Sequence, residues 1–193
     1  LLQTGMPFPQ LDRLMARFGM PMGPFRLLDE IGLDVVAEVG RTMTAAFGER
    51  FAAAPVMDAV FATGLTGRKG GRGFYTYDDS KPKRPNDEIV QRIRSAVTDE
   101  PPTPPEAEER LVFSMINEAA RALADDVVDA PASLDVAMIM GAGFPPFRGG
   151  LLRYADSNGL DHIAERLRHY AGSVGPRFQP AEALLQRQSF YGG

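Results

Sequence analysis

Cysteine is missing from this chain of 193 residues, and so is any excess of basic side chains. Without cysteine the chain can form no disulfide, no thiolate nucleophile and no Cys-ligated zinc or iron–sulfur site. Lys and Arg total 21 against 25 Asp and Glu, a formal net charge of −4. A duplex-binding surface needs a clustered basic excess, so we expect no nucleic-acid partner. The lack of cysteine suits a reducing compartment, and we expect a cytoplasmic protein.

Long hydrophobic runs are missing as well. The longest uncharged apolar stretch, at 136–147, is short and is interrupted by Gly141 and Gly143. A membrane helix needs roughly 20 consecutive apolar residues, so we expect no membrane span. The chain opens on Leu1 without methionine or a basic segment, which predicts no secretory signal and suggests a piece of a longer protein.

Glycine and proline are abundant, with 20 and 16 residues, and the prolines mark a boundary. Four of them fall within 101–105, where proline cannot continue a helix because it lacks the amide donor and clashes with the preceding turn. We therefore predict a first helical repeat at 1–97, a Pro-rich linker at 98–105 and a second helical repeat at 106–193.

An internal repeat supports this division. Asp12 recurs at an offset of 123 as Asp135, within matching Leu-Asp pairs. Further identities share an offset of 127, namely Gly23, Arg26, Asp29, Gly32, Leu33, Asp34, Ala37 and Glu38 with Gly150, Arg153, Asp156, Gly159, Leu160, Asp161, Ala164 and Glu165. We interpret the chain as two copies of one unit, the first of which starts after its own beginning.

Helical periodicity dominates both copies. The clearest helix is expected over 106–124, and a shorter one over 86–97. Asp34 and Asp161 precede apolar residues at helical spacing, so both are expected to be N-caps. Evidence for a strand is confined to 73–77, an alternating segment after a glycine-rich turn.

The glycine-rich turn at 67–73 contains Arg68, Lys69 and Arg72 and could bind an anion. It follows a helical stretch instead of a strand, and no Ser or Thr follows Lys69, so it fits neither the dinucleotide fingerprint nor the Walker pattern. A tight turn with solvated charges is favoured. A phosphate contact, such as one to a nucleotide-bearing thioester, is the alternative.

The remaining polar candidates favour structural roles over catalysis. Asp29 and Asp156 occupy equivalent places on apolar helices, and we expect structural ion pairs with Arg26 and Arg153. Asn117 is expected to form a helix–helix hydrogen bond. The histidines, His162 and His169, are too far apart along their helix to ligate one metal and are expected to be surface or packed residues.

Two loops, at 18–25 and 141–150, combine prolines, glycines and large apolar side chains at equivalent places in the repeat. A tight helix–helix crossing is the first interpretation. The alternative is a wall for an apolar ligand such as a fatty-acyl chain, beside a mobile hinge.

These motifs carry a family resemblance. The first copy has GMPMGPF at 19–25, GLD at 32–34 and GFYTY at 73–77, and it resembles the C-terminal domain of 3-hydroxyacyl-CoA dehydrogenases. The second copy has NEA at 117–119, GFPPFRGG at 143–150 and RYAD at 153–156. It is similar to the extra repeat of multifunctional fatty-acid oxidation alpha subunits.

The resemblance implies an all-α fold of two tandem copies of this C-terminal unit, packed as a pseudo-dimer. The parent protein would be an NAD-dependent 3-hydroxyacyl-CoA dehydrogenase of beta-oxidation, joined to an enoyl-CoA hydratase domain. NAD and the catalytic His–Glu pair would belong to a Rossmann domain outside these residues, so the chain alone would be inactive and would contribute no catalytic residue.

The resemblance also implies partners and a substrate surface. The partners would be the Rossmann domain of the parent chain, the acyl-CoA substrate and a thiolase subunit. Met22, Pro24 and Phe25 would face the acyl chain as part of the cleft wall. Two other functions stay open: a stand-alone, non-catalytic association module for beta-oxidation enzymes, and a family relative that has lost its activity.

Overall fold

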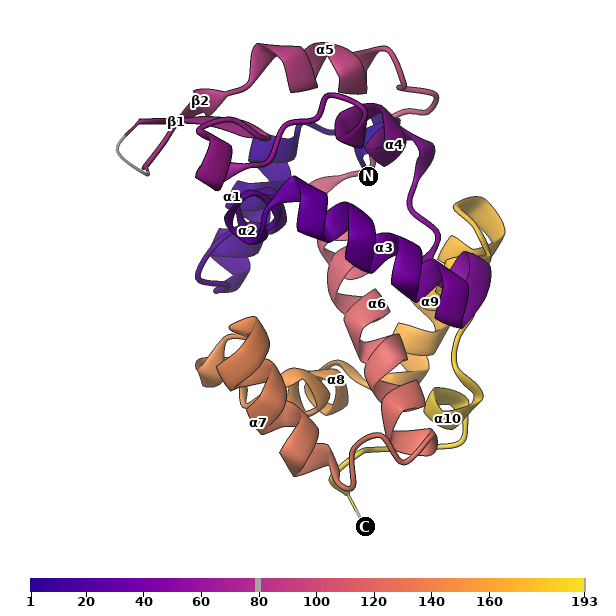
Figure 1. Cartoon of the computed structure of the whole chain (residues 1–193). Coiled ribbons are helices and arrows are strands. Elements are labelled where there is room, and N and C mark those ends of the chain that lie inside the picture. The colour runs from indigo at the N-terminus through magenta and orange to yellow at the C-terminus, as the bar shows by residue number, and fades with distance from the viewer. Residues whose placement is uncertain (79–80, 193) are drawn as a thin grey trace. The chain divides into compact units, whose positions relative to one another are not determined.

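The computed structural model describes residues 1–78 and 81–192, which fall into two compact, mostly helical units. Unit 1 comprises residues 1–17 and 22–104, and unit 2 comprises residues 18–21 and 105–193. Both units are built from helices joined by tight turns, with one small hairpin in unit 1 (Figure 1). The helical fold class expected from the sequence is confirmed.

Unit 1 begins with two short helices that cross at the first proline- and glycine-rich loop. Its elements are α1 (Phe8–Phe18), α2 (Pro24–Ile31), α3 (Leu33–Phe47), α4 (Pro55–Phe61), β1 (Tyr75–Asp78), β2 (Lys81–Pro85) and α5 (Asp87–Arg94). Pro24 and Pro55 each start a helix, where the missing amide proton costs nothing because the first turn has no acceptor for it. Asn86 caps α5 by accepting the Glu88 amide at 3.1 Å.

An aromatic cluster forms the centre of unit 1. The ring of Phe25 lies 4.8 Å from that of Phe74 and 5.8 Å from that of Phe8, measured between ring centroids. The Phe8 ring also meets the Tyr75 ring edge-on at 5.3 Å. These four side chains join α1, the start of α2 and the start of β1 into one buried core.

The hairpin extends the single strand that the sequence predicts. β1 pairs with β2 in antiparallel fashion, with Tyr75 opposite Pro85 and Thr76 opposite Arg84. The strand β2 was not predicted, because its sequence, KPKRP, contains two prolines and no alternation. Proline is tolerated here because each strand has only one neighbour in this two-stranded sheet.

Unit 2 repeats the helical plan with a long first helix. Its elements are α6 (Pro104–Ala124), α7 (Pro131–Ala142), α8 (Leu151–Asn158), α9 (Leu160–Ser173) and α10 (Glu182–Leu185). Its core is contributed by α6, α8, α9 and α10, together with the loop residue Phe144. Its fully buried side chains include Ile116, Phe144, Leu151, Leu152, Ile163, Leu167 and Leu184. The helix expected over 106–124 is confirmed, and it starts at Pro104.

The two aspartates expected to be N-caps are not caps. The N-cap positions of α3 and α9 are Gly32 and Gly159, whose φ angles are 102° and 82°. Asp34 and Asp161 lie two residues further on, in the first turn of each helix, where a negative charge still interacts favourably with the helix dipole. Glycine displaces the cap by two residues because it supplies the positive φ angle that lets one helix follow the other directly.

Within residues 1–78 and 81–192, no helix is both long enough and apolar enough to cross a membrane.

Candidate functional site

A buried aspartate on α1 organises the start of the next helix in unit 1. The carboxylate of Asp12 accepts the amide of Phe25 at 2.8 Å and that of Arg26 at 3.3 Å. It also accepts the hydroxyl of Tyr75 at 2.7 Å. Because Phe25 and Arg26 lie in the first turn of α2, Asp12 caps this helix from a neighbouring one and ties it to the hairpin.

Unit 2 contains the same arrangement. Asp135, on α7, accepts the amides of Leu152 and Arg153 at 2.7 and 3.2 Å and the hydroxyl of Tyr191 at 2.8 Å. Each repeat therefore uses one buried carboxylate to fix the first turn of its following helix. The matching Leu-Asp pairs indicate the repeat in the sequence, but they do not reveal this role.

A second aspartate in each repeat binds the segment that returns to the helices. Asp29 is fully buried and accepts the amides of Phe74 and Tyr75 at 2.8 and 2.9 Å and the hydroxyl of Tyr77 at 2.8 Å. In the second copy, Asp156 accepts the amides of Phe190 and Tyr191 and the hydroxyl of Ser189, all within 3.0 Å.

The expected ion pairs with Arg26 and Arg153 are therefore wrong, although the structural role is correct. Asp29 and Asp156 bind backbone amides and hydroxyl groups, which the sequence pattern does not reveal. The guanidinium of Arg153 lies 3.8 Å from the centre of the Tyr191 ring instead. A cation over an aromatic face is a favourable contact of its own.

Two of the repeated glycines are explained by the aspartates. A Cβ atom on Gly23 would lie 2.2 Å from the Cα of Asp12, and one on Gly150 would lie 2.3 Å from the Cγ of Asp135. No side chain fits at either position without moving the aspartate. The glycine-aspartate pairs are thus one packing device, repeated in both units.

The glycine-rich turn at 67–73 is shaped by Asp29 as well. A Cβ atom on Gly73 would lie 2.0 Å from Asp29 Oδ1, and one on Gly67 would lie 2.4 Å from the carbonyl oxygen of Asp29. The glycines allow the turn to approach α2 closely. This contact accounts for their presence without an anion.

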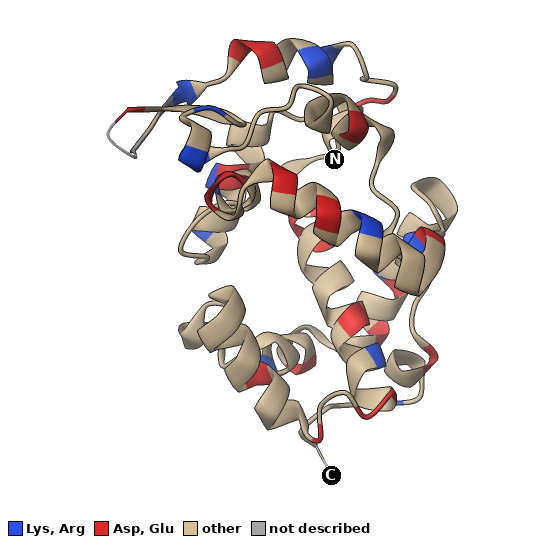
Figure 2. Cartoon of the chain, in the orientation of Figure 1, with Lys and Arg blue, Asp and Glu red and all other residues tan. Residues whose placement is uncertain are grey.

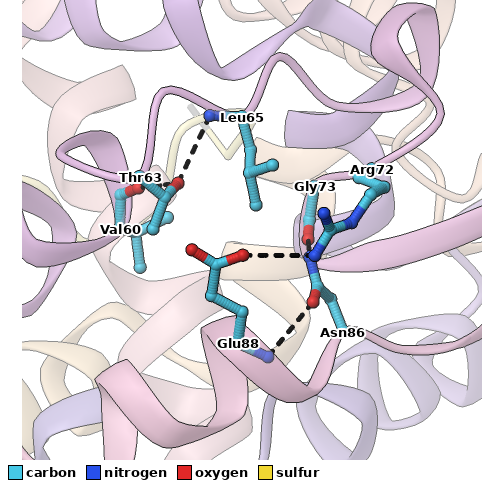
Figure 3. A network of polar contacts seen from close by, with 7 residues as sticks. All are labelled: Val60, Thr63, Leu65, Arg72, Gly73, Asn86 and Glu88. Carbon is cyan, nitrogen blue, oxygen red and sulfur yellow. Dashed lines mark hydrogen bonds and ion pairs between the residues drawn. The ribbon is translucent and has the colours of Figure 1, made fainter.

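Each cation of this turn has a carboxylate partner. Arg68 pairs with Glu30, Lys69 Nζ lies 2.7 Å from Asp34, and Arg72 lies 3.1 Å from Glu88. Figure 3 shows the last pair beside Asn86, whose side-chain amide donates to the carbonyl oxygen of Gly73 at 2.9 Å. These cations are therefore neutralised locally, which favours the tight-turn interpretation over the phosphate contact.

Burial changes the proton affinity of the unit 1 cluster. Desolvation raises the pKa of Asp12 and of Asp29, and the hydrogen bonds that each accepts oppose that rise. The pKa of Tyr75 and that of Tyr77 are also raised, first by burial and then by the bond that each phenol donates to a carboxylate. Both phenols keep their protons, so the cluster is a set of satisfied hydrogen bonds.

The three residues predicted to face an acyl chain lie together at the start of α2. Met22 and Pro24 are partly exposed, whereas Phe25 is buried within the aromatic cluster of unit 1. Met22 and Pro24 thus have exposed surface that an acyl chain could contact. Phe25 instead anchors the turn that presents them.

The other candidates are also structural. Asn117 is buried on α6, donates to the carbonyl oxygen of Gln179 at 2.9 Å and accepts the amide of Ala181 at 2.7 Å. Its partners belong to the segment before α10, so the expected bond between helices is instead a helix–loop bond. His162 and His169 are exposed. No group of potential metal ligands occurs among the described residues.

The fold and these clusters define a class of protein. It is a duplicated helical domain in which buried carboxylates accept hydrogen bonds from backbone amides of the same domain. The sequence of residues 1–77 and 107–190 matches the family described as "3-hydroxyacyl-CoA dehydrogenase, C-terminal domain". The chain belongs to this family, and the match in two segments agrees with two repeats.

Relatives place both repeats in longer proteins. The chain is 39% identical over 186 residues to the fatty acid oxidation complex subunit alpha of Shewanella loihica, covering 96% of this chain and 26% of that protein. The subunit alpha of Vibrio vulnificus is 36% identical over 187 residues, covering 97% and 26%. The chain thus spans about a quarter of the length of these relatives.

Solved structures share the fold. The dehydrogenase part of multifunctional enzyme 1 from C. elegans superposes with a TM-score of 0.70 at 25% identity, covering 94% of this chain and 42% of that one. The 3-hydroxybutyryl-CoA dehydrogenase of Escherichia coli gives a TM-score of 0.73 at 21% identity, covering 95% and 54%.

Proposed function

We propose that this chain is the paired helical region of an NAD-dependent 3-hydroxyacyl-CoA dehydrogenase of beta-oxidation, within a multifunctional protein that also carries enoyl-CoA hydratase. It closes one side of the acyl-CoA cleft and associates with the Rossmann domain, and the catalytic residues lie outside it. The main support for a non-catalytic role is that the carboxylates of four buried or partly buried aspartates accept hydrogen bonds from backbone amides and hydroxyl groups. These are Asp12, Asp29, Asp135 and Asp156. Carboxylates used in this way hold the fold and are not free to exchange protons with a substrate.

The NAD cofactor does not fit the residues of this chain. The glycine-rich turn at 67–73 is packed against the backbone and carboxylate of Asp29, and its three cations are paired with carboxylates. A dinucleotide needs open backbone amides at a strand–helix turn. We therefore assign NAD binding to the Rossmann domain of the parent protein.

The first experiment is reconstitution of the dehydrogenase from two parts. The NAD-binding part of the Shewanella loihica relative, cut before the region that this chain matches, is mixed with residues 1–193. NAD-linked oxidation of a 3-hydroxyacyl-CoA is then followed, with each part alone as a control. Activity only in the mixture supports the proposal. Activity of this chain alone would overturn the assignment of catalysis to the missing domain.

The substrate wall is tested in the active mixture. Met22→Ala removes partly exposed surface at the start of α2, whereas Met57→Ala removes a similarly half-buried methionine from α4. We expect Met22→Ala to raise KM for long acyl chains by several-fold and to leave kcat nearly unchanged. The reason is that a wall residue contacts the acyl chain equally in the bound substrate and in the transition state. An identical KM profile for both variants would remove Met22 from the wall.

The association-module alternative is separated by the same mixture. A stable complex with the Rossmann part or with a thiolase subunit, but without dehydrogenase activity or acyl-CoA binding, would favour it.

A further inference from the structure

The junction between α8 and α9 in unit 2 contains the dipeptide Asn158-Gly159. Asparagine is a chemically labile residue, and a following glycine has no side chain to hinder attack by its backbone nitrogen on the asparagine side chain. The chain has three asparagines, and the other two, Asn86 and Asn117, are buried, hydrogen-bonded and followed by acidic residues. Asn158 is exposed. It therefore combines exposure with a following glycine, and the other two asparagines have neither.

The fold does not require an asparagine at this place. At the offset of 127 that relates the two repeats, Asn158 corresponds to Ile31, and Gly159 corresponds to Gly32. Ile31 ends α2 and is 47% exposed, so an apolar side chain can precede the same glycine. Both glycines have positive φ angles, 102° and 82°, which explains why glycine occurs in both copies. The asparagine has no such structural explanation.

The last turn of α8 has less tertiary support than its first. The three buried residues of α8 all lie within its first five positions, and residues 157–159 are exposed. The amide of Gly159 donates to the carbonyl oxygen of Asp156, three residues back, at 3.2 Å. The amide of Gly32 in the first copy instead donates to Leu28, four residues back, at 3.0 Å. Exposed helix ends open locally far more often than the core does, and such opening releases the nitrogen of Gly159 from its acceptor.

We propose that Asn158 is a site of covalent modification, at which the side-chain amide is lost by attack from within the chain. When the last turn of α8 opens, the backbone nitrogen of Gly159 gives its proton to a solvent base and bonds to Cγ of Asn158. The bond from Cγ to Nδ2 breaks, and that nitrogen takes protons from solvent and leaves as ammonia.

The product of this step is a five-membered cyclic imide that includes the nitrogen of Gly159. Water adds to one of its two carbonyl carbons, and the bond from that carbon to the nitrogen breaks. Opening on one side gives an aspartate at position 158, and opening on the other gives an isoaspartate, whose backbone runs through the side-chain carbon. The reaction consumes water and releases ammonia, and it needs no oxidant or cofactor.

Loss of the amide reverses the polarity at the end of α8. Nδ2 of Asn158 donates to the carbonyl oxygen of Tyr154 at 2.7 Å, whereas a carboxylate can only accept. The new negative charge falls in the last turn, where the helix dipole disfavours it. Arg153 and Asp156 are the charged residues of α8 (Figure 2), so the product has two carboxylates at the end of one helix. The modification should therefore loosen this end.

Asp156 connects the junction to the C-terminal segment at 189–192. Its carboxylate accepts the amides of Phe190 and Tyr191 at 2.8 and 3.0 Å. A second charge two residues away, or the extra backbone carbon of an isoaspartate, disturbs the turn that positions Asp156. We therefore expect the modified chain to hold residues 189–192 less firmly, while α2 in unit 1 stays unchanged.

Peptide mapping by mass spectrometry tests the chemistry, on the 193-residue chain aged in mildly alkaline buffer. We expect the mass gain of an amide-to-carboxylate change at Asn158 to exceed that at Asn86 or Asn117 by about tenfold or more, because the buried asparagines need a larger opening. Methyl transfer by an isoaspartyl methyltransferase identifies the isoaspartate product. Equal conversion at the three asparagines would overturn the proposal.

Gly159→Ala tests whether the backbone nitrogen of residue 159 is the attacking group. A Cβ atom there would meet nothing within 4 Å, but it hinders the approach of the nitrogen to Asn158. The positive φ angle strains an alanine, and this strain favours opening of the turn. We expect a several-fold slower reaction despite that strain. An unchanged or faster reaction would overturn the intramolecular attack.

Hydrogen exchange of two variants tests the structural consequence. Asn158→Asp has the aspartate product, and Asn158→Ala is the matched control, because it loses the same donor without adding a charge. We expect the amides of 151–158 and 189–192 to exchange fastest in Asn158→Asp, more slowly in Asn158→Ala and slowest in the native chain, with α2 unchanged. Equal exchange in the two variants would show that the added charge does not loosen the C-terminal segment, and this consequence of the modification would be wrong.

Discussion

Single side chains set the geometry of each repeat. Asp12 and Asp135 each replace a local N-cap by reaching across from the preceding helix, and a tyrosine hydroxyl completes each carboxylate. A donor left without its acceptor in such a buried place costs about 1–3 kcal/mol. The glycine facing each aspartate is therefore as necessary as the aspartate itself.

Gly23→Ala should destabilise the chain by about 3 kcal/mol, through overpacking and loss of the Asp12 bonds. The added Cβ atom would lie 2.2 Å from the backbone of Asp12, which cannot move without releasing the first turn of α2. The measurement is the free energy of unfolding in denaturant.

Gly40→Ala is the matched control for this substitution. Gly40 lies within α3, and a Cβ atom there would meet nothing within 4 Å. Alanine should stabilise the helix there by about 0.5–1 kcal/mol, because glycine is the more flexible residue. Equal effects of the two substitutions would show that the Gly23–Asp12 contact is unimportant.

Asp29 should make stability depend on pH. Its pKa is raised by burial in the folded chain, so the folded state binds the proton more tightly than the unfolded state does. Its stabilising contribution is complete below the unfolded pKa of about 3.9 and is lost as the pH rises through the higher folded pKa. The advantage of the native chain over Asp29→Asn should therefore shrink with rising pH. Denaturant unfolding curves of the native chain and of Asp29→Asn at a series of pH values measure this difference in the free energy of unfolding. A difference that grows as the pH rises through the folded pKa would contradict the raised pKa of Asp29.

The helices α3 and α9 occupy equivalent places in the two repeats but differ in how much of each is buried. Five residues of α9 are buried, and Arg166 pairs with Glu109 of α6 at 2.6 Å. Of α3, only Leu33 is buried, and Val39 stands exposed where α9 has Arg166. The two helices have nearly the same length but very different tertiary support.

We expect backbone amides of α3 to exchange with solvent faster than those of α9, because helix stability in proteins comes largely from packing. Hydrogen exchange followed by mass spectrometry compares peptides from the two helices in one sample. Equal protection would show that burial does not govern their stability.

The helices and the duplication could be predicted from the sequence, whereas the polar contacts could not. Periodicity located α6, and identities at one offset related Asp29 to Asp156. The partners of Asp29 are backbone amides some 45 residues away, and backbone groups leave no trace in the sequence. Likewise, β2 could not be predicted from the sequence, because it is a strand through its pairing with β1 and not through its composition.

The division of the whole chain also departs from its sequence order. Phe18 ends α1, whose other residues belong to unit 1, yet by its contacts it belongs to unit 2. Its ring lies 5.3 Å from that of Tyr154 and 5.7 Å from that of Phe144, and the Arg148 guanidinium lies 3.9 Å from the ring centre. Its carbonyl oxygen accepts a bond from Arg148 at 3.0 Å. A residue of the first repeat thus completes the core of the second unit.

Phe18→Ala should therefore weaken unit 2, by about 3–5 kcal/mol for a buried phenylalanine. Phe25→Ala is the matched variant, because it removes a buried ring from the aromatic cluster of unit 1. Phe18→Ala should accelerate the hydrogen exchange of backbone amides in α8, and Phe25→Ala should accelerate that of amides in α2 and β1. If Phe18→Ala instead accelerated α2 and β1 as strongly as α8, its ring would support unit 1, and the boundary between the units would follow the sequence repeat after all.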